Sequence, residues 1–153
     1  MATEGLGRLF NVAPITGAGV GTSLKECGAM TFVCTGNDTF TLTVAPSFAG
    51  SYVTPPTTTI GGGLIRNKYT NPQTNGTDVW TKVALASGSY ANSATISSGT
   101  LVFTIYPIDL AGDPSGTNYS YIKCTAGGSG LVMTIAHDLL VQRKPANLPK
   151  LSA

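Results

Sequence analysis

Charged side chains are scarce in this sequence, where they make up 10% of the 153 residues, against roughly 25% in a typical soluble domain. Nine basic and seven acidic residues leave a formal net charge of +2. A charge this small produces no strong field toward nucleic acid or anionic lipid, so we expect neither as a partner. The same scarcity argues against a DNA-binding helix, a coiled coil and a charged enzyme cleft.

Side chains that carry catalysis are few as well. His137 is the single histidine, which excludes a metal site built from several histidines. The cysteines Cys27, Cys34 and Cys124 are odd in number and irregularly spaced, unlike a disulfide framework or a zinc motif. We interpret them as buried free thiols. We therefore expect no enzymatic activity, no metal ion and no cofactor.

Long apolar runs are absent too. The N-terminus has no apolar stretch of signal-peptide length, and no run of about 18 apolar residues occurs. We therefore expect synthesis in the cytoplasm and no membrane partner.

A glycine cluster at residues 17–21 invites comparison with phosphate-binding loops. The dinucleotide pattern needs a glycine where Thr22 stands, and the nucleotide-triphosphate loop needs Gly-Lys where Leu24 precedes Lys25. Neither motif is present, so we interpret the cluster as part of a flexible arm.

What the sequence does contain is a succession of strand signals. Hydrophobic residues reach 42%, and the polar remainder is rich in Thr, Ser, Asn and Gly, which favours strands and turns. We count roughly seven or eight strands with turns every eight to twelve residues, and no stretch with helical periodicity. The pattern predicts an all-β fold, an antiparallel β-sandwich or a jelly-roll-like barrel.

The clearest pair of strands lies at residues 30–34 and 40–44. In both strands every second residue is apolar, and the residues between are threonines except for Val33. Gly36-Asn37-Asp38, between the strands, is a turn signal. This arrangement predicts a β-hairpin with one apolar face. Further strands are expected at 64–69, 78–86, 94–96, 101–106, 119–124 and 131–136, the one at 101–106 being covered on both faces because it is almost continuously apolar.

His137 and Asp138 fall near the end of the last expected strand. Adjacent residues of a strand point to opposite faces, so we expect the two side chains to lie apart and His137 to make one hydrogen bond. Two aromatic residues, Tyr69 and Trp80, flank the loop around Asn75 and could form a platform on which a sugar stacks, although core or interface packing is the commoner role.

The two ends of the chain differ from its middle. Residues 1–24 are rich in glycine and residues 143–153 contain two prolines, so we divide the chain into an extended N-terminal arm (1–24), a β-sandwich body (25–142) and an extended C-terminal arm (143–153). Both arms carry apolar residues, which an arm surrounded by water would not need, and this suggests that the arms lie against a partner. These candidate interface residues are Leu6, Leu9, Phe10, Val12, Arg143, Lys144, Leu148 and Leu151.

The stretch from Gly130 to Pro149, with His137-Asp138 inside it and Arg143-Lys144-Pro145 near its end, resembles the ends of small structural proteins of tailed bacteriophages. The block from Asp78 to Lys82, followed by a strand rich in small residues, adds to the resemblance. In size and texture the chain is most similar to head decoration, or cement, proteins.

The resemblance implies a β-rich protein bound to the outside of the virion capsid. Its expected partners are the major capsid protein and copies of itself, as a trimer or, less favoured, a dimer. The expected role is to stabilise the shell by bridging capsid subunits, without catalytic residues. The alternatives are a tail-tube, connector or fibre-associated virion protein, or a carbohydrate-binding adhesin module.

Overall fold

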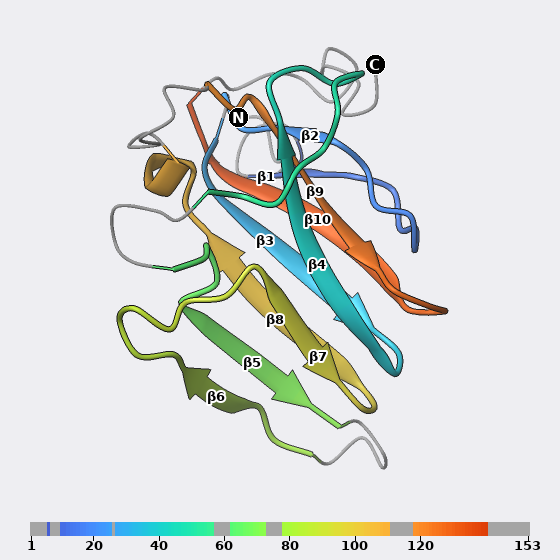
Figure 1. Cartoon of the computed structure of the whole chain (residues 1–153). Helices are drawn as coiled ribbons and strands as arrows, with labels where there is room; N and C mark the ends of the chain where they lie inside the picture. The colour runs from blue at the N-terminus through green and yellow to red at the C-terminus, as the bar shows by residue number, and fades with distance from the viewer. Residues whose placement is uncertain are drawn as a thin grey trace, which may run out of the picture.

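A computed structural model describes residues 6, 10–25, 27–56, 62–72, 78–110 and 118–140. In these residues the fold is all-β, with two antiparallel sheets packed face to face (Figure 1). The predicted all-β class is confirmed. Because the two sheets remain separate, the architecture is a β-sandwich and not a closed jelly-roll-like barrel.

Ten strands and one short 3-10 helix lie within the described residues. The larger sheet has the order β1-β10-β3-β8-β5-β6, and the smaller sheet has the order β2-β9-β4-β7. In chain order the elements are β1 (Phe10–Val12), β2 (Thr22–Ser23), β3 (Cys27–Thr35), β4 (Asp38–Ala45), β5 (Asn67–Asn71), β6 (Thr81–Ala84), β7 (Ser93–Ile96), β8 (Thr100–Ile105), η1 (Pro107–Leu110), β9 (Tyr121–Ala126) and β10 (Leu131–Leu139).

The core lies between the two sheets and is built from alternate residues of the strands. Phe32 in β3 and Phe103 in β8 are fully buried, with ring centroids 5.4 Å apart. Phe40 in β4 enters the same cluster from the smaller sheet. Each such side chain contributes roughly 1.5–3 kcal/mol by leaving water, so the alternating apolar residues hold the two sheets together.

The predicted hairpin at residues 30–44 is wrong, although both of its strands exist. β3 pairs with β10 and β8, whereas β4 pairs with β7 and β9. The turn after Thr35 therefore carries the chain from one sheet to the other, with Gly36 at φ 112°. Both strands bury an apolar face in the shared core. The alternation of apolar residues in the sequence is therefore the same whether the two strands pair in a hairpin or lie in opposite sheets.

The described part of residues 1–24 lies against this chain's own sheets, whereas we expected an extended arm that lies against a partner. β1 pairs with β10, and β2 pairs with β9, so this segment forms an edge strand in each sheet. Between them, the Ala13 amide donates to Thr134 and the Thr16 amide donates to Val132. The body therefore already includes Phe10, well before the expected boundary at residue 24. The expected C-terminal arm, 143–153, lies outside the described residues.

Several strands also shift or change their environment. β5 begins at Asn67, while Leu64 and Ile65, expected within that strand, are fully buried before it. In β8 only the alternate residues Leu101, Phe103 and Ile105 are buried. The expectation that this strand is covered on both faces is wrong, because no further layer lies on the outer face of its sheet in the described structure (Figure 1).

Candidate functional site

The larger sheet ends on one side at β6, and all four residues of β6 are exposed. β6 pairs with β5 alone among the described strands, and in Figure 1 it lies at the lower end of the molecule, beyond the strands of the smaller sheet. Val79 and Trp80, just before β6, are 78% and 50% exposed, and Val83 within it is also exposed. An open edge strand beside exposed apolar side chains is a surface for pairing with another chain.

The sequence did not single out this β6 edge as an interface. Alternation over residues 78–86 predicted an ordinary strand, but only residues 81–84 are in β6. No local signal separates an edge strand from an inner one, because both alternate with the same period.

The opposite edge of the larger sheet is β1. Leu6 and Phe10, two of the predicted interface residues, are each more than one-third exposed there, whereas Val12 is half-buried opposite Ile135. We call the β1 and β6 edges with their exposed apolar residues the two edge surfaces. The other predicted interface residues lie outside the described residues: Leu9, Arg143, Lys144, Leu148 and Leu151.

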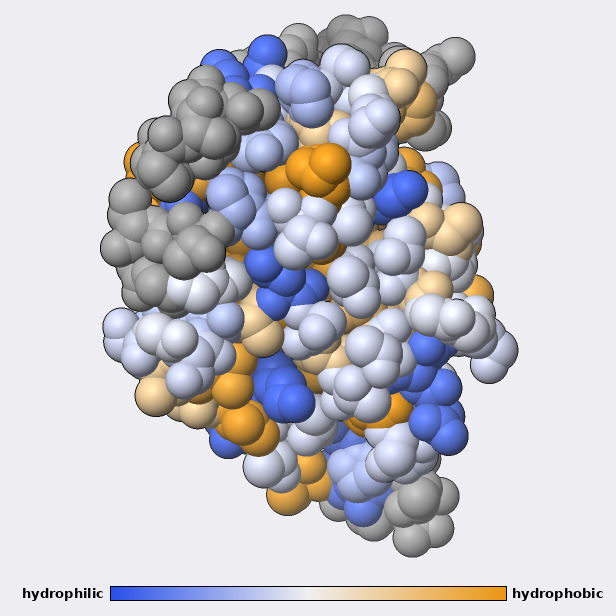
Figure 2. Space-filling view, viewed as in Figure 1, coloured by the Kyte–Doolittle hydropathy of each residue, from blue (hydrophilic) through white to orange (hydrophobic). Residues whose placement is uncertain are grey.

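The space-filling view shows how apolar residues are distributed on one face of the molecule. In Figure 2 they form separate patches among mostly polar residues, and some of these patches lie in the lower part of the molecule, where Figure 1 places β5 and β6. Tyr69 in β5 is 39% exposed and Trp80 is 50% exposed. Both rings of the predicted sugar platform are thus accessible, Tyr69 in β5 and Trp80 just before the neighbouring strand β6.

An ion pair connects the start of β5 to η1. Arg66 Nη2 donates to Asp109 Oδ1, and the guanidinium carbon lies 5.5 Å from the ring centre of Tyr106. The Asp109 side chain is 4% exposed and that of Arg66 is 34% exposed. Arg66 Nε and Asp109 Oδ2 are buried with no hydrogen-bond partner in the structure. The two residues are 43 positions apart, so no local sequence signal pairs them, and we interpret the pair as a structural anchor.

His137 lies on the outer face of the larger sheet, as its half-buried position between buried Ala136 and exposed Asp138 shows. Its Nε2 is 2.8 Å from Thr31 Oγ1, which is itself 2.7 Å from Thr104 Oγ1. The Nδ1 atom is 3.6 Å from Asp138 Oδ2. The prediction that these two side chains lie apart is wrong, because Asp138 has φ 53° and departs from extended backbone.

The three cysteines are free and buried, as the sequence predicted. Cys34 of β3 and Cys124 of β9 belong to opposite sheets. The Cys124 side chain beside it, and then burial, raise the pKa of the Cys34 thiol far above its usual range. A thiol that stays protonated is a poor nucleophile, so we interpret this pair as core packing.

In the described part of the chain, no group of three His, Cys, Asp or Glu side chains is placed to hold a metal ion. None of the helices in that same part is long and apolar enough to cross a membrane. Comparisons with protein-family models, with curated proteins and with solved structures found no match. We argue the function of the protein from the two edge surfaces.

Proposed function

We propose that this chain is a structural virion protein that binds the outside of a bacteriophage capsid and stabilises the shell by bridging neighbouring capsid subunits. The observation that carries the proposal is that both open edges of one sheet present exposed apolar side chains, Leu6 and Phe10 at β1 and Val79 and Trp80 near β6. A rigid sheet with an attachment surface at each edge can contact two neighbours at once. The resemblance of residues 130–149 to phage structural proteins supports the same function.

The proposed mechanism is mechanical and uses no catalytic residue or cofactor. The partner is the major capsid protein, and copies of this chain add further contacts, as a trimer or a dimer. An interface near 800 Å² per partner gives a gross burial free energy on the order of 20 kcal/mol, most of which offsets the cost of association. Because the chain is only 10% charged, this attachment depends little on ion pairs and tolerates salt.

The test is to mix the purified protein with capsids that lack a decoration protein and to measure co-sedimentation and particle stability on heating. We expect saturable binding and a higher temperature of particle disruption. Phe10→Asp and Val83→Asp each place a charge on one edge surface, and we expect each to weaken binding at least tenfold because the carboxylate loses its hydration at the interface.

The matched control is Val53→Asp, which makes the same kind of change at a residue that is 45% exposed and pairs with Val44 of the smaller sheet. We expect this variant to bind like the parent protein. If all three variants bind equally well, or if the parent protein does not bind capsids at all, the proposed function is wrong.

Copies per particle distinguish the shell from other places in a virion. A decoration protein is present in hundreds of copies, whereas a tail-tube, connector or fibre-associated protein follows the sixfold symmetry of the tail. Quantitative mass spectrometry of purified particles measures this number. A copy number of six, or a few multiples of six, would move the proposal from the shell to the tail.

A further inference from the structure

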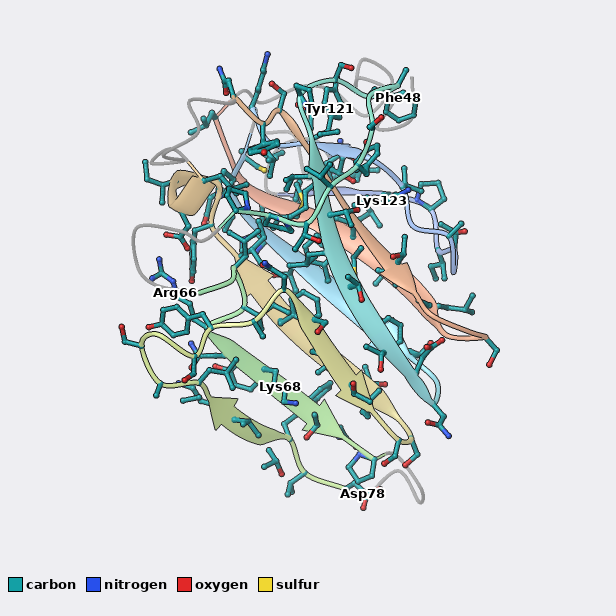
Figure 3. All side chains as sticks on the ribbon, viewed as in Figure 1. Phe48, Arg66, Lys68, Asp78, Tyr121 and Lys123 are labelled. Carbon is teal, nitrogen blue, oxygen red and sulfur yellow. The ribbon has the colours of Figure 1, made fainter. Side chains whose placement is uncertain are left out.

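A groove lies on the outer face of the smaller sheet, separate from both edge surfaces. It has a volume of about 310 Å³ and is lined by Gly19, Val20, Gly21, Phe48, Tyr52 and Lys123. Lys123 points to this outer face because its neighbours in β9, Ile122 and Cys124, are buried in the core. Figure 3 shows Phe48, Tyr121 and Lys123 in the same upper part of the molecule. We call this feature the aromatic groove.

One wall of the aromatic groove is bare main chain from the glycine cluster. Gly19 has φ 70°, and a Cβ added to it would collide with the carbonyl group of Cys124. A Cβ on Gly21 would collide with the hydroxyl of Tyr52 and would lie 3.4 Å from Cδ2 of Phe48. The prediction of a flexible arm is therefore wrong at these residues, because glycine lets the chain approach β9 and the two rings closely.

The opposite wall is aromatic and held in place by its surroundings. Phe48 packs edge-on against Tyr121, with ring centroids 6.0 Å apart and an interplanar angle of 71°. The Tyr52 hydroxyl is buried, with no hydrogen-bond partner in the structure. Burial, and then electrostatic repulsion from the neighbouring Tyr121 phenol when both are ionised, raise the pKa of Tyr52, so this phenol stays neutral at physiological pH.

A single positive charge lies between these walls. The ammonium nitrogen of Lys123 is 4.6 Å from the ring centre of Tyr52, a cation–π contact. No carboxylate of the described residues forms a salt bridge with Lys123. The aromatic groove therefore places a cation beside apolar ring surfaces in one small volume.

We propose that the aromatic groove binds one sugar ring that carries a carboxylate, that is, a hexuronic acid unit. A volume of about 310 Å³ is at the small end of ligand sites and suits a single ring. The aromatic side chains provide apolar surface for the C–H face of a pyranose, and Lys123 pairs with the carboxylate. An isolated anion would not need the aromatic wall.

The test is a two-dimensional NMR titration of the full chain with D-glucuronate, with D-glucose as the neutral match and acetate as the charge without a ring. We expect amide shifts in Gly19, Gly21, Phe48, Tyr52 and Lys123, and millimolar binding of glucuronate. We expect glucose to bind about tenfold more weakly, because it lacks the charge-assisted contact, and acetate to bind more weakly still.

Two variants separate the parts of the site. Lys123→Gln is expected to remove the preference for glucuronate over glucose, while Phe48→Ala weakens binding of both sugars at least fivefold. Lys68→Gln, at another half-buried lysine, is the matched control and keeps the parent affinities. The spectrum of each variant shows whether it is folded.

The inference is overturned if about 50 mM glucuronate causes no shift in the aromatic groove, if acetate binds as well as glucuronate, or if Lys123→Gln keeps the full preference. None of these outcomes concerns capsid binding, so this site and the proposed function can fail independently.

Discussion

The larger sheet has two parts that differ in burial. One part contains β3 and β8, which the smaller sheet covers, and the other contains the outer strands β5 and β6. In β8, and in β3 from Met30 to Cys34, every second residue is buried in the core between the sheets, whereas in β6 all four residues are exposed. Lys68 of β5 stands opposite Phe103 on one side and Val83 on the other, so the three side chains share one face. Along this face burial falls from complete at Phe103 to partial at Lys68, and Val83 is exposed. Alternation therefore produces a strand, but burial requires an opposing layer.

The end of the core explains why the β5–β6 part can serve another purpose. Leu64 and Ile65 are fully buried just before β5, and the chain there pairs with Ala91. This segment closes the core before the outer strands begin. Since β6 buries little, its side chains are free to be selected for contacts with a partner.

The largest expected difference between the two parts is in stability. Phe103→Ala leaves a cavity in the core and is expected to lower the free energy of unfolding by about 3–5 kcal/mol. Val83→Ala, on the same face but uncovered, is expected to change it by less than about 0.5 kcal/mol. Urea unfolding measures both. Equal losses would show that β6 belongs to the cooperative core.

The Arg66–Asp109 ion pair lies where the core ends and the outer strands begin, because Arg66 comes directly before β5. Arg66→Met leaves the Asp109 carboxylate buried without its partner, and we expect a loss of roughly 2–3 kcal/mol, below the range for a fully buried pair because Arg66 is 34% exposed. The double variant Arg66→Met with Asp109→Leu is expected to regain most of this loss. A double variant no more stable than the single one would contradict the account.

Asp38, the first residue of β4, makes the stability of the protein depend on pH. Its carboxylate accepts hydrogen bonds from the amides of Thr39, Gly128 and Gly130 at 2.7–2.8 Å. The Gly130 bond first, and then those of Gly128 and Thr39, hold the pKa of Asp38 below its usual value. A depressed pKa contributes stability above the unfolded value of about 3.9 and loses it as the pH falls through the folded value.

Asp38→Asn is therefore expected to be less stable than the parent protein at neutral pH, with the two melting temperatures converging below about pH 4. Thermal unfolding followed by circular dichroism from neutral to acidic pH checks this. A difference that stays constant over the whole range would mean that the carboxylate charge is not responsible.

An effect on stability as small as that of Val83→Ala is expected at Trp80, which is 50% exposed beside β6. Trp80→Ala is expected to change the free energy of unfolding by less than about 0.5 kcal/mol, while weakening capsid attachment. Urea unfolding and capsid co-sedimentation give the two values. A loss above about 2 kcal/mol would place this ring in the core rather than on an edge surface.

The sequence pointed to one of the two edge surfaces and not to the other. Leu6 and Phe10 were chosen as interface candidates because apolar residues are unexpected in a glycine-rich segment, and the structure shows both side chains exposed. The β6 edge was not, because Val79 and Trp80 alternate like the residues of any strand. The aromatic groove was not recognisable either, since Gly21 and Lys123 are far apart in the chain and meet only where β2 pairs with β9.

The sequence by itself determined the all-β class, most strand positions and the apolar face of each strand, because these follow from a side-chain period that is local to the chain. Only the tertiary structure decided which strands pair. It placed β3 and β4 in different sheets, and it made edge strands of β1 and β2 where an arm extended against a partner was expected. The physical reason is that an apolar face is buried equally well by several pairings, and the choice among them depends on contacts between residues distant in the chain.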